Sequence, residues 1–69
     1  MIDRDLLISA TIRKHLTLAK LAQELGISAP SMSRKITSSD FRLKEIEKIS
    51  SVLELKVTER DAIFFAKRG

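Results

Sequence analysis

Residues 28–37 combine small hydroxyl side chains with one arginine and one lysine, and they contain no acidic residue. Met32 and Ile36 are four residues apart, so in a helix both face the core. The side chains that point most directly away from the core are then Pro30, Arg34 and Thr37, flanked by Ser31, Ser33 and Ser38. An ordinary solvated helix more often carries Glu and Lys on its outer face. A small, polar, acid-free face with a guanidinium instead favours close approach to a polyanion.

Other kinds of chemistry lack the residues they need. The chain has no cysteine and a single histidine, His15, so neither a disulfide nor a metal site is expected. There is no glycine-rich phosphate loop and no Ser/His/Asp set, and 69 residues leave little bulk to enclose a pocket. We therefore expect no cofactor and no enzymatic activity. His15 follows a predicted helix, where histidine adopts the left-handed conformation more readily than most residues, and is interpreted as a C-terminal cap.

Positive charge is concentrated in the middle of the chain. The net charge is +4 and the isoelectric point is about 9.9. Seven basic and two acidic residues lie between Arg13 and Lys44, which gives this segment a net charge of +5. Such a distribution is compatible with a solvated basic surface, and it is also the electrostatic footprint of a nucleic-acid-binding protein. The pattern of helices has to distinguish these two interpretations.

Five short helices are predicted to position these residues, at about residues 3–14, 18–25, 28–38, 43–53 and 58–65. Each carries apolar residues at helical spacing. In the first and fourth helices the predicted inward residues are Leu6, Leu7 and Ala10, and Leu43, Ile46, Ile49 and Leu53. Two glycines and one proline are too few turn residues for a small β-barrel. The chain is therefore predicted to be all-α, as one domain covering residues 1–69.

Capping residues mark where the central helices begin and end. Thr17 is a good N-cap for the second helix, and Gly26 is expected to end it in the left-handed conformation. The N-cap of the third helix is Ser28 or Ala29. Ser28 has the capping side chain, whereas Pro30 disfavours helical geometry at the residue before it.

The C-terminal segment predicts the last helix and an aromatic pair. Thr58 and Asp61 are spaced like a capping box with Asp in the place of Glu, so the last helix is predicted to begin at Thr58. Phe64 and Phe65 are adjacent, and a helix cannot bury both equally in one narrow stripe. Either both help to close the core, or one of them remains at the surface as a contact for another molecule.

No targeting or membrane-spanning segment is predicted. No apolar run approaches the ~18–20 residues that cross a bilayer. The first five residues, MIDRD, lack the basic character of a signal peptide. We expect a cytoplasmic protein without a membrane partner.

The second and third predicted helices, with the turn between them, form a helix-turn-helix, a motif whose second helix enters the major groove of DNA. Residues 17–36, TLAKLAQELGISAPSMSRKI, resemble the lambda-repressor-like helix-turn-helix domains of phage Cro and repressor proteins. Ala22 matches the small residue where the two helices cross, Gly26 the turn glycine, and Met32 the apolar residue that fixes the recognition helix. The resemblance covers about residues 3–66 and implies a five-helix DNA-binding domain.

The resemblance also implies which residues contact a double-stranded DNA operator. The bases would be contacted from the start and outer face of the third helix, by Ser28, Ala29, Ser31, Ser33 and Arg34. Of these, Arg34 can pair bidentately with guanine. The DNA backbone would be contacted by Thr17, Lys35, Thr37, Arg42 and Lys44.

Two departures from the family change what can be carried over. Leu18 stands where many relatives have a Gln that holds a phosphate. Ala29 and Pro30 stand where many have Gln residues that contact bases. Base recognition would then depend on Arg34, the serines, methyl contacts and DNA shape.

The resemblance implies a Cro-like repressor of a phage or prophage genetic switch, acting in the cytoplasm of a bacterial host. Such proteins usually bind as homodimers, because one recognition helix offers too few base contacts. The region Leu55–Phe65 is the candidate dimer surface. The alternative is a modulator that binds a partner repressor through an exposed phenylalanine or the Val52/Val57 region. An antitoxin is a third and weaker class, because the sequence shows no neutralising tail of the disordered type.

Overall fold

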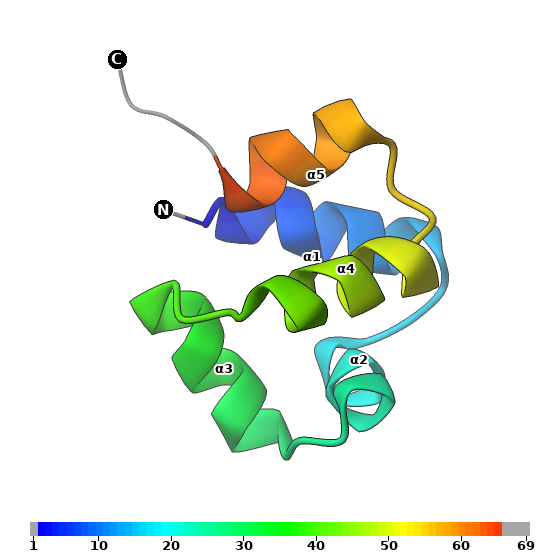
Figure 1. Ribbon diagram of the computed structural model, residues 1–69. Helices are drawn as coiled ribbons and strands as arrows, with labels where there is room; N and C mark the ends of the chain where they lie inside the picture. Colours follow the sequence, from blue (N-terminus) through cyan, green and yellow to red (C-terminus); the bar gives the residue numbers. More distant parts are fainter. Residues whose placement is uncertain (1, 66–69) are drawn as a thin grey trace.

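Five α-helices form in the computed structural model, which describes residues 2–65 of the chain (Figure 1). They are α1 (Arg4–Arg13), α2 (Leu18–Leu25), α3 (Ala29–Ser38), α4 (Leu43–Val52) and α5 (Val57–Phe64). Residues 2–65 contain no β-strand. The predicted all-α class and five-helix layout are therefore confirmed.

Side-chain caps start the first three helices. The Asp3 carboxylate accepts a hydrogen bond from the Leu6 N–H at 3.0 Å, and Thr17 Oγ1 accepts one from the Lys20 N–H at 3.1 Å. Ser28 Oγ accepts one from the Ser31 N–H at 3.2 Å. Each bond satisfies a backbone donor that the helix itself leaves free. Ser28, rather than Ala29, is thus the N-cap of α3.

Residues in the left-handed conformation lie just after the ends of α1, α2, α3 and α4. Gly26 ends α2 at φ +74°, as predicted. The C-cap of α1 is Lys14 rather than His15, and His15 follows it in the predicted left-handed conformation at φ +59°. Ser39 after α3 (φ +56°) and Glu54 after α4 (φ +54°) adopt the same conformation without being glycine. Ser39 also accepts a hydrogen bond from the Ile2 N–H at 3.1 Å, which ties the start of the chain to the end of α3.

The predicted start of the last helix at Thr58 is wrong. The N-cap is Lys56 and α5 begins at Val57, so Thr58 lies inside the first turn. The Glu59 carboxylate accepts a hydrogen bond from the Lys56 N–H at 3.0 Å. This bond is the carboxylate half of a capping box, and it places the start of the helix before the position that a Thr58 cap would give.

A single core joins the five helices. Its buried apolar members are Leu7, Ala10, Leu21, Ala22, Met32, Ile36, Ile46, Ile49, Leu53, Ile63 and Phe64. Thr11 is also buried, and its hydroxyl donates to the Leu7 carbonyl at 2.7 Å.

Two residues predicted to face inward do not. Leu6 is 43% exposed and Leu43 is 65% exposed. Leu43 is the first residue of α4, and Phe41, just before it, packs on the core instead. The rings of Phe41 and Phe64 meet edge to face, with centroids 5.8 Å apart. Phe64 is therefore buried, whereas the adjacent Phe65 remains 46% exposed.

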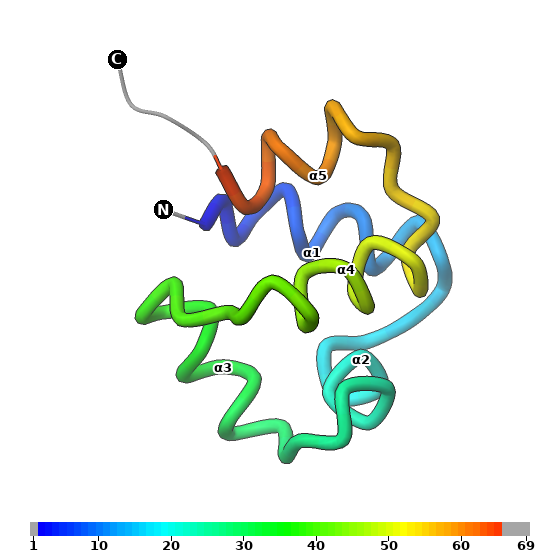
Figure 2. Tube along the Cα trace, viewed as in Figure 1, coloured from blue at the N-terminus to red at the C-terminus, as the bar shows by residue number. Residues whose placement is uncertain are grey.

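The helices separate the molecule into two ends. α2 and α3 pack together at one end, α1 and α5 pack together at the other, and α4 crosses between the pairs (Figures 1 and 2). The Asp3 N–H donates to the Ile63 carbonyl at 2.8 Å and closes the α1–α5 end. Because α3 packs mainly on α2, it lies at the edge of the molecule and one of its faces is free (Figure 1). Among residues 2–65, none of the helices has the length and apolar character that crossing a membrane requires.

Candidate nucleic-acid interface

The outer face of α3 is exposed because the opposite face of the helix is buried against the core. Met32 and Ile36 are buried in the core, and α3 packs on α2. The exposed residues of α3 that were predicted to contact DNA are Ala29, Ser33, Arg34 and Thr37, and Ser28 is exposed just before the helix. Pro30 is exposed between them, and Ser31 is partly buried. The face is small in side-chain volume and acid-free, as the sequence predicted.

Ser28 and Ser31 form a hydrogen-bonded pair at the start of α3. Besides capping the Ser31 N–H, the Ser28 hydroxyl donates to Ser31 Oγ at 3.0 Å. The Ser28 hydroxyl is thus used within the protein. Ser31 accepts in this pair, which leaves its own proton free to be donated to a ligand.

Arg34 offers the strongest hydrogen-bond donor on this face. Its side chain is exposed, and among residues 2–65 its guanidinium has neither a hydrogen bond nor an ion pair. Its carbonyl accepts from the Ser38 hydroxyl at 2.8 Å, an interaction of the backbone alone. The five donors of the guanidinium are therefore available for a planar acceptor such as a guanine edge or a phosphate.

The starts of α2 and α3 favour an anion. The first turns of α2 and α3 contain no acidic residue, whereas those of α1, α4 and α5 contain Asp5, Glu45 and Glu59. The N-terminus of a helix carries a partial positive charge that acidic residues would normally offset. The acid-free starts of α2 and α3 therefore suit binding of phosphate. At α4 the exposed cations Arg42 and Lys44 flank the first-turn carboxylate of Glu45.

Thr17 lies at the start of α2 and is exposed. Its Oγ1 accepts from the Lys20 N–H, which leaves the hydroxyl proton free. Lys20 is a cation at the same helix end that the sequence analysis did not select. Its ammonium lies 3.4 Å from Gln23 Oε1 and has no acidic partner among the described residues.

Lys35 and Glu45 link α3 to α4. Lys35 Nζ lies 3.3 Å from Glu45 Oε1 and 3.4 Å from the Asp40 carbonyl, and both paired side chains are only 19% exposed. The same carboxylate oxygen accepts from the Arg42 N–H at 2.8 Å. The bond from the Arg42 N–H, followed by the one from Lys35, holds the pKa of Glu45 below its usual 4.5, against the opposing effect of burial.

Glu45 was missed by the sequence analysis. The signal was its position three residues after Arg42, where a capping-box carboxylate reaches back to the N-cap N–H. An Arg side chain cannot accept the reciprocal hydrogen bond. Only the carboxylate half of the box forms, and the sequence pattern is correspondingly weak.

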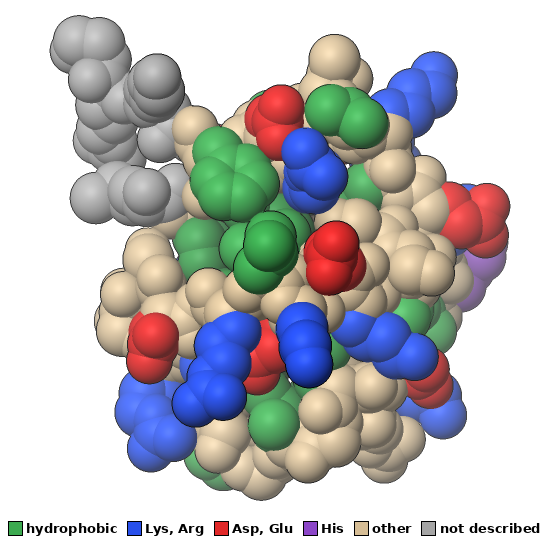
Figure 3. All heavy atoms as spheres, viewed as in Figure 1, with side chains coloured by type: hydrophobic (Ala, Val, Ile, Leu, Met, Phe, Trp, Pro, Cys, Tyr) green, Lys and Arg blue, Asp and Glu red, His purple; other side chains and the backbone are tan. Residues whose placement is uncertain are grey.

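Figure 3 shows a row of Lys and Arg side chains crossing the face between α4 and the α2–α3 pair. The basic residues between Arg13 and Lys44 nevertheless fall into two groups, those with an acidic partner and those without one. Arg13, Lys14 and Lys35 form ion pairs with Glu59, Glu54 and Glu45. Within the segment from Arg13 to Lys44, the cations without an acidic partner among the described residues are Lys20, Arg34, Arg42 and Lys44, which lie on α2, α3 or the start of α4.

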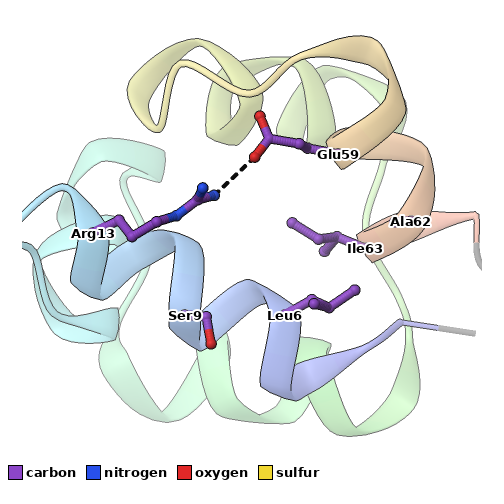
Figure 4. Close-up of a pocket in the computed structure, with 6 residues that line it drawn as sticks. All are labelled: Leu6, Ser9, Arg13, Glu59, Ala62 and Ile63. Atoms are coloured by element: carbon purple, nitrogen blue, oxygen red, sulfur yellow. Dashed lines mark hydrogen bonds and ion pairs between the residues drawn. The ribbon is translucent and has the colours of Figure 1, made fainter.

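An open groove of about 340 Å³ lies between α1 and α5, at the other end of the molecule from α3 (Figure 4). Its lining is mainly apolar and consists of Leu6, Ser9, Arg13, Glu59, Ala62 and Ile63. Arg13 Nη2 donates to Glu59 Oε2 at 2.9 Å across one end of the groove. Arg13 thus ties α1 to α5 and contributes no free charge to the α3 face.

Comparison with protein families agrees with this geometry. The family model for the Cro/C1-type HTH DNA-binding domain matches residues 7–59, which run from α1 into the first turn of α5. Comparison with curated proteins and with solved structures gives no significant match. The family model covers most of the chain, including the whole of α2, the turn and α3. The chain therefore belongs to the Cro/C1-type helix-turn-helix family of DNA-binding domains.

Proposed function

We propose that the protein is a sequence-specific transcriptional repressor, Cro-like, that acts in a phage or prophage genetic switch inside a bacterial cell. In this proposal α3 lies in the major groove of a double-stranded operator. The bases are contacted by Ser28, Ala29, Ser31, Ser33 and Arg34. The observation that carries the proposal is the exposed, acid-free face of α3, with the unpaired Arg34 guanidinium on it.

The DNA backbone is contacted on either side of α3. Thr17 offers its hydroxyl and the free N–H groups of the first turn of α2. Arg42 and Lys44 offer two cations at the start of α4, and Thr37 lies on the last turns of α3 near the groove edge. Lys35 was also predicted to contact the DNA backbone, but its ammonium forms an ion pair with Glu45.

A homodimer on a two-fold symmetric operator is part of the proposal. One recognition helix contacts too few bases for strong specificity, and pairing two copies doubles the contacts. Three large exposed apolar side chains supply a surface for the second copy, and they are Leu43 on α4, Val57 on α5 and Phe65 at the C-cap of α5. Two of them lie within the predicted region Leu55–Phe65, and Figure 3 shows apolar side chains at the surface over α5 and the neighbouring part of α4.

Selection of bound fragments from a random DNA pool tests the proposal. We expect an enriched sequence motif, and binding that weakens steeply between low and moderate salt as counterions are released from the DNA. Absence of binding to any fragment at low salt would contradict the proposal. That result would favour the alternative, a modulator that binds a partner repressor, for which the half-exposed Phe65 offers a contact.

Two substitutions separate base contacts from backbone contacts. Arg34→Ala is expected to relax the base preference at one position, costing about 1–3 kcal/mol on the preferred sequence and little on others. Lys44→Ala is expected to weaken binding to all sequences alike and to reduce the salt slope by about one. Binding constants on operator and scrambled DNA measure both effects. An unchanged preference in Arg34→Ala would refute the assignment of the recognition face.

A further inference from the structure

Lys35 is held by two acceptors that lie outside its own helix. Its ammonium lies 3.3 Å from Glu45 Oε1 at the start of α4 and 3.4 Å from the Asp40 carbonyl in the preceding loop. Only 19% of its side chain is exposed, in contrast to the exposed Arg42 and Lys44. A lysine in this setting has limited freedom to reach a phosphate on another molecule.

Glu45 connects the same pair to the backbone of α4. Its Oε1 accepts both from Lys35 Nζ and from the Arg42 N–H. Within residues 2–65, the bond between Lys35 and Glu45 is the one side-chain hydrogen bond that joins α3 to α4. This pair therefore contributes to the orientation of α3 relative to Arg42 and Lys44, together with the packing of Met32 and Ile36 in the core.

We propose that Lys35 and Glu45 are positioning residues, which set the angle of α3 against the phosphate-binding start of α4 without contacting DNA themselves. The inference rests on the proposed DNA-binding function and replaces a phosphate contact by Lys35. The pair couples two kinds of contact that must match the DNA together: base contacts from α3 and phosphate contacts from Arg42 and Lys44. A change in the angle between them loses specific binding before it loses non-specific binding.

Glu45→Gln separates the two roles because they predict opposite signs. Glu45 is an anion beside the proposed interface, so electrostatics alone predict that its removal strengthens binding to every DNA sequence. The same removal also frees Lys35 to contact a phosphate. A positioning role predicts the reverse, a loss of operator binding. Gln retains an amide oxygen for the Arg42 N–H, so the start of α4 is preserved in the variant.

A double-mutant cycle with Glu45→Gln, Lys35→Met and the two combined tests the proposal. The readout is the ratio of dissociation constants on non-operator and operator DNA. We expect each single change to lower this ratio by about tenfold, and the combined change to lower it no further. Lys35→Arg, which retains a cation and its donors, is expected to preserve most of the ratio. Lys56→Met removes one charge at the distant start of α5 and is the matched control.

Two results would overturn the proposal. The first is tighter binding of Glu45→Gln to all sequences, with Lys35→Met costing the same in both backgrounds. The second is an unchanged ratio in both single variants. Circular dichroism at the assay temperature verifies that each variant is folded.

A second measurement needs no DNA. Amide chemical shifts of Ser33 and Arg34 in the free protein are expected to move in Glu45→Gln, whose changed side chain belongs to another helix, and to stay in place in Lys56→Met. Unmoved shifts in Glu45→Gln would contradict the positioning role. If the wild-type protein bound no DNA, the proposed function would fail, while these shifts would still decide whether the pair orients α3.

Discussion

Glu45 and Glu59 play matching parts in two different helices. Each carboxylate accepts the N–H of its helix N-cap and a hydrogen bond from a cation of another helix, which is Lys35 for Glu45 and Arg13 for Glu59. The N-cap N–H bond is the larger cause and the cation the next favourable one, and together they lower both pKa values from 4.5. Single residues thus fix both the helix starts and the contacts between helices.

These shifts predict how stability depends on pH. Because both carboxylates have a lower pKa when folded, their stabilisation is complete well above pH 4.5 and is lost as the pH falls below it. The free energy of unfolding, measured with urea, is expected to decrease as the pH is lowered from about 6 to 3. The decrease is expected to be smaller in Glu45→Gln. Glu24→Gln, which alters an exposed carboxylate of α2, is the control. Equal pH dependence in all three proteins would argue against the prediction.

At the scale of elements, the sequence predicted a helix end correctly only where the residue at that end itself favours the required conformation. Thr17, Gly26 and His15 were predicted because each residue type favours the conformation that it adopts, Gly26 through its lack of a Cβ. Ser39 and Glu54 have no such preference, and their positive φ accompanies backbone hydrogen bonds that close the helix ends, from the Asp40 N–H to the Lys35 carbonyl and from the Leu55 N–H to the Ser50 carbonyl. The start of α5 was missed for a related reason: the bond from Lys56 to Glu59 that begins it competes with an equally plausible cap at Thr58.

The left-handed positions make a prediction about turn stability. Glu54→Gly is expected to raise the free energy of unfolding by about 1 kcal/mol, since glycine has no Cβ penalty at φ +54°. The lost ion pair with Lys14 is mostly exposed and offsets only a few tenths of this gain. Gly26→Ala is expected to lower stability by about the same amount through strain alone, because open space surrounds the added Cβ. Denaturant unfolding measures both, and a destabilised Glu54→Gly would contradict the account.

At the scale of the whole molecule, the sequence predicted the order of the helices and the free face of α3, but not the division of charge. Helical periodicity locates Met32 and Ile36 inward, so the outer face follows directly. The ion pairs of Arg13 with Glu59 and of Lys35 with Glu45 join residues 46 and 10 positions apart, and they depend on how helices pack. Net charge along the chain could therefore indicate a basic segment without showing which cations are free.

The exposed apolar residues of α4 and α5 predict self-association. The described part of the protomer is 33 Å in its longest dimension, close to the ~34 Å that separates half-sites one turn of DNA apart. Two copies in direct contact are therefore of the right size to occupy adjacent half-sites. Phe65→Ser is expected to weaken dimer formation at least about tenfold, because an aromatic side chain at an interface contributes a large share of its energy.

Sedimentation over a range of protein concentrations, with and without operator DNA, measures this association. Ile12→Ser is the matched control, since Ile12 on α1 is 63% exposed and lies outside the α4–α5 surface. Phe65 also lies 5.9 Å from the Arg60 guanidinium, so thermal unfolding of both variants is needed to separate loss of association from loss of stability. If Phe65→Ser and Ile12→Ser associated equally, the second copy would bind elsewhere. A wild-type protein that remains monomeric both free and on its operator would remove the homodimer from the proposed function, because a single α3 would then make all the base contacts.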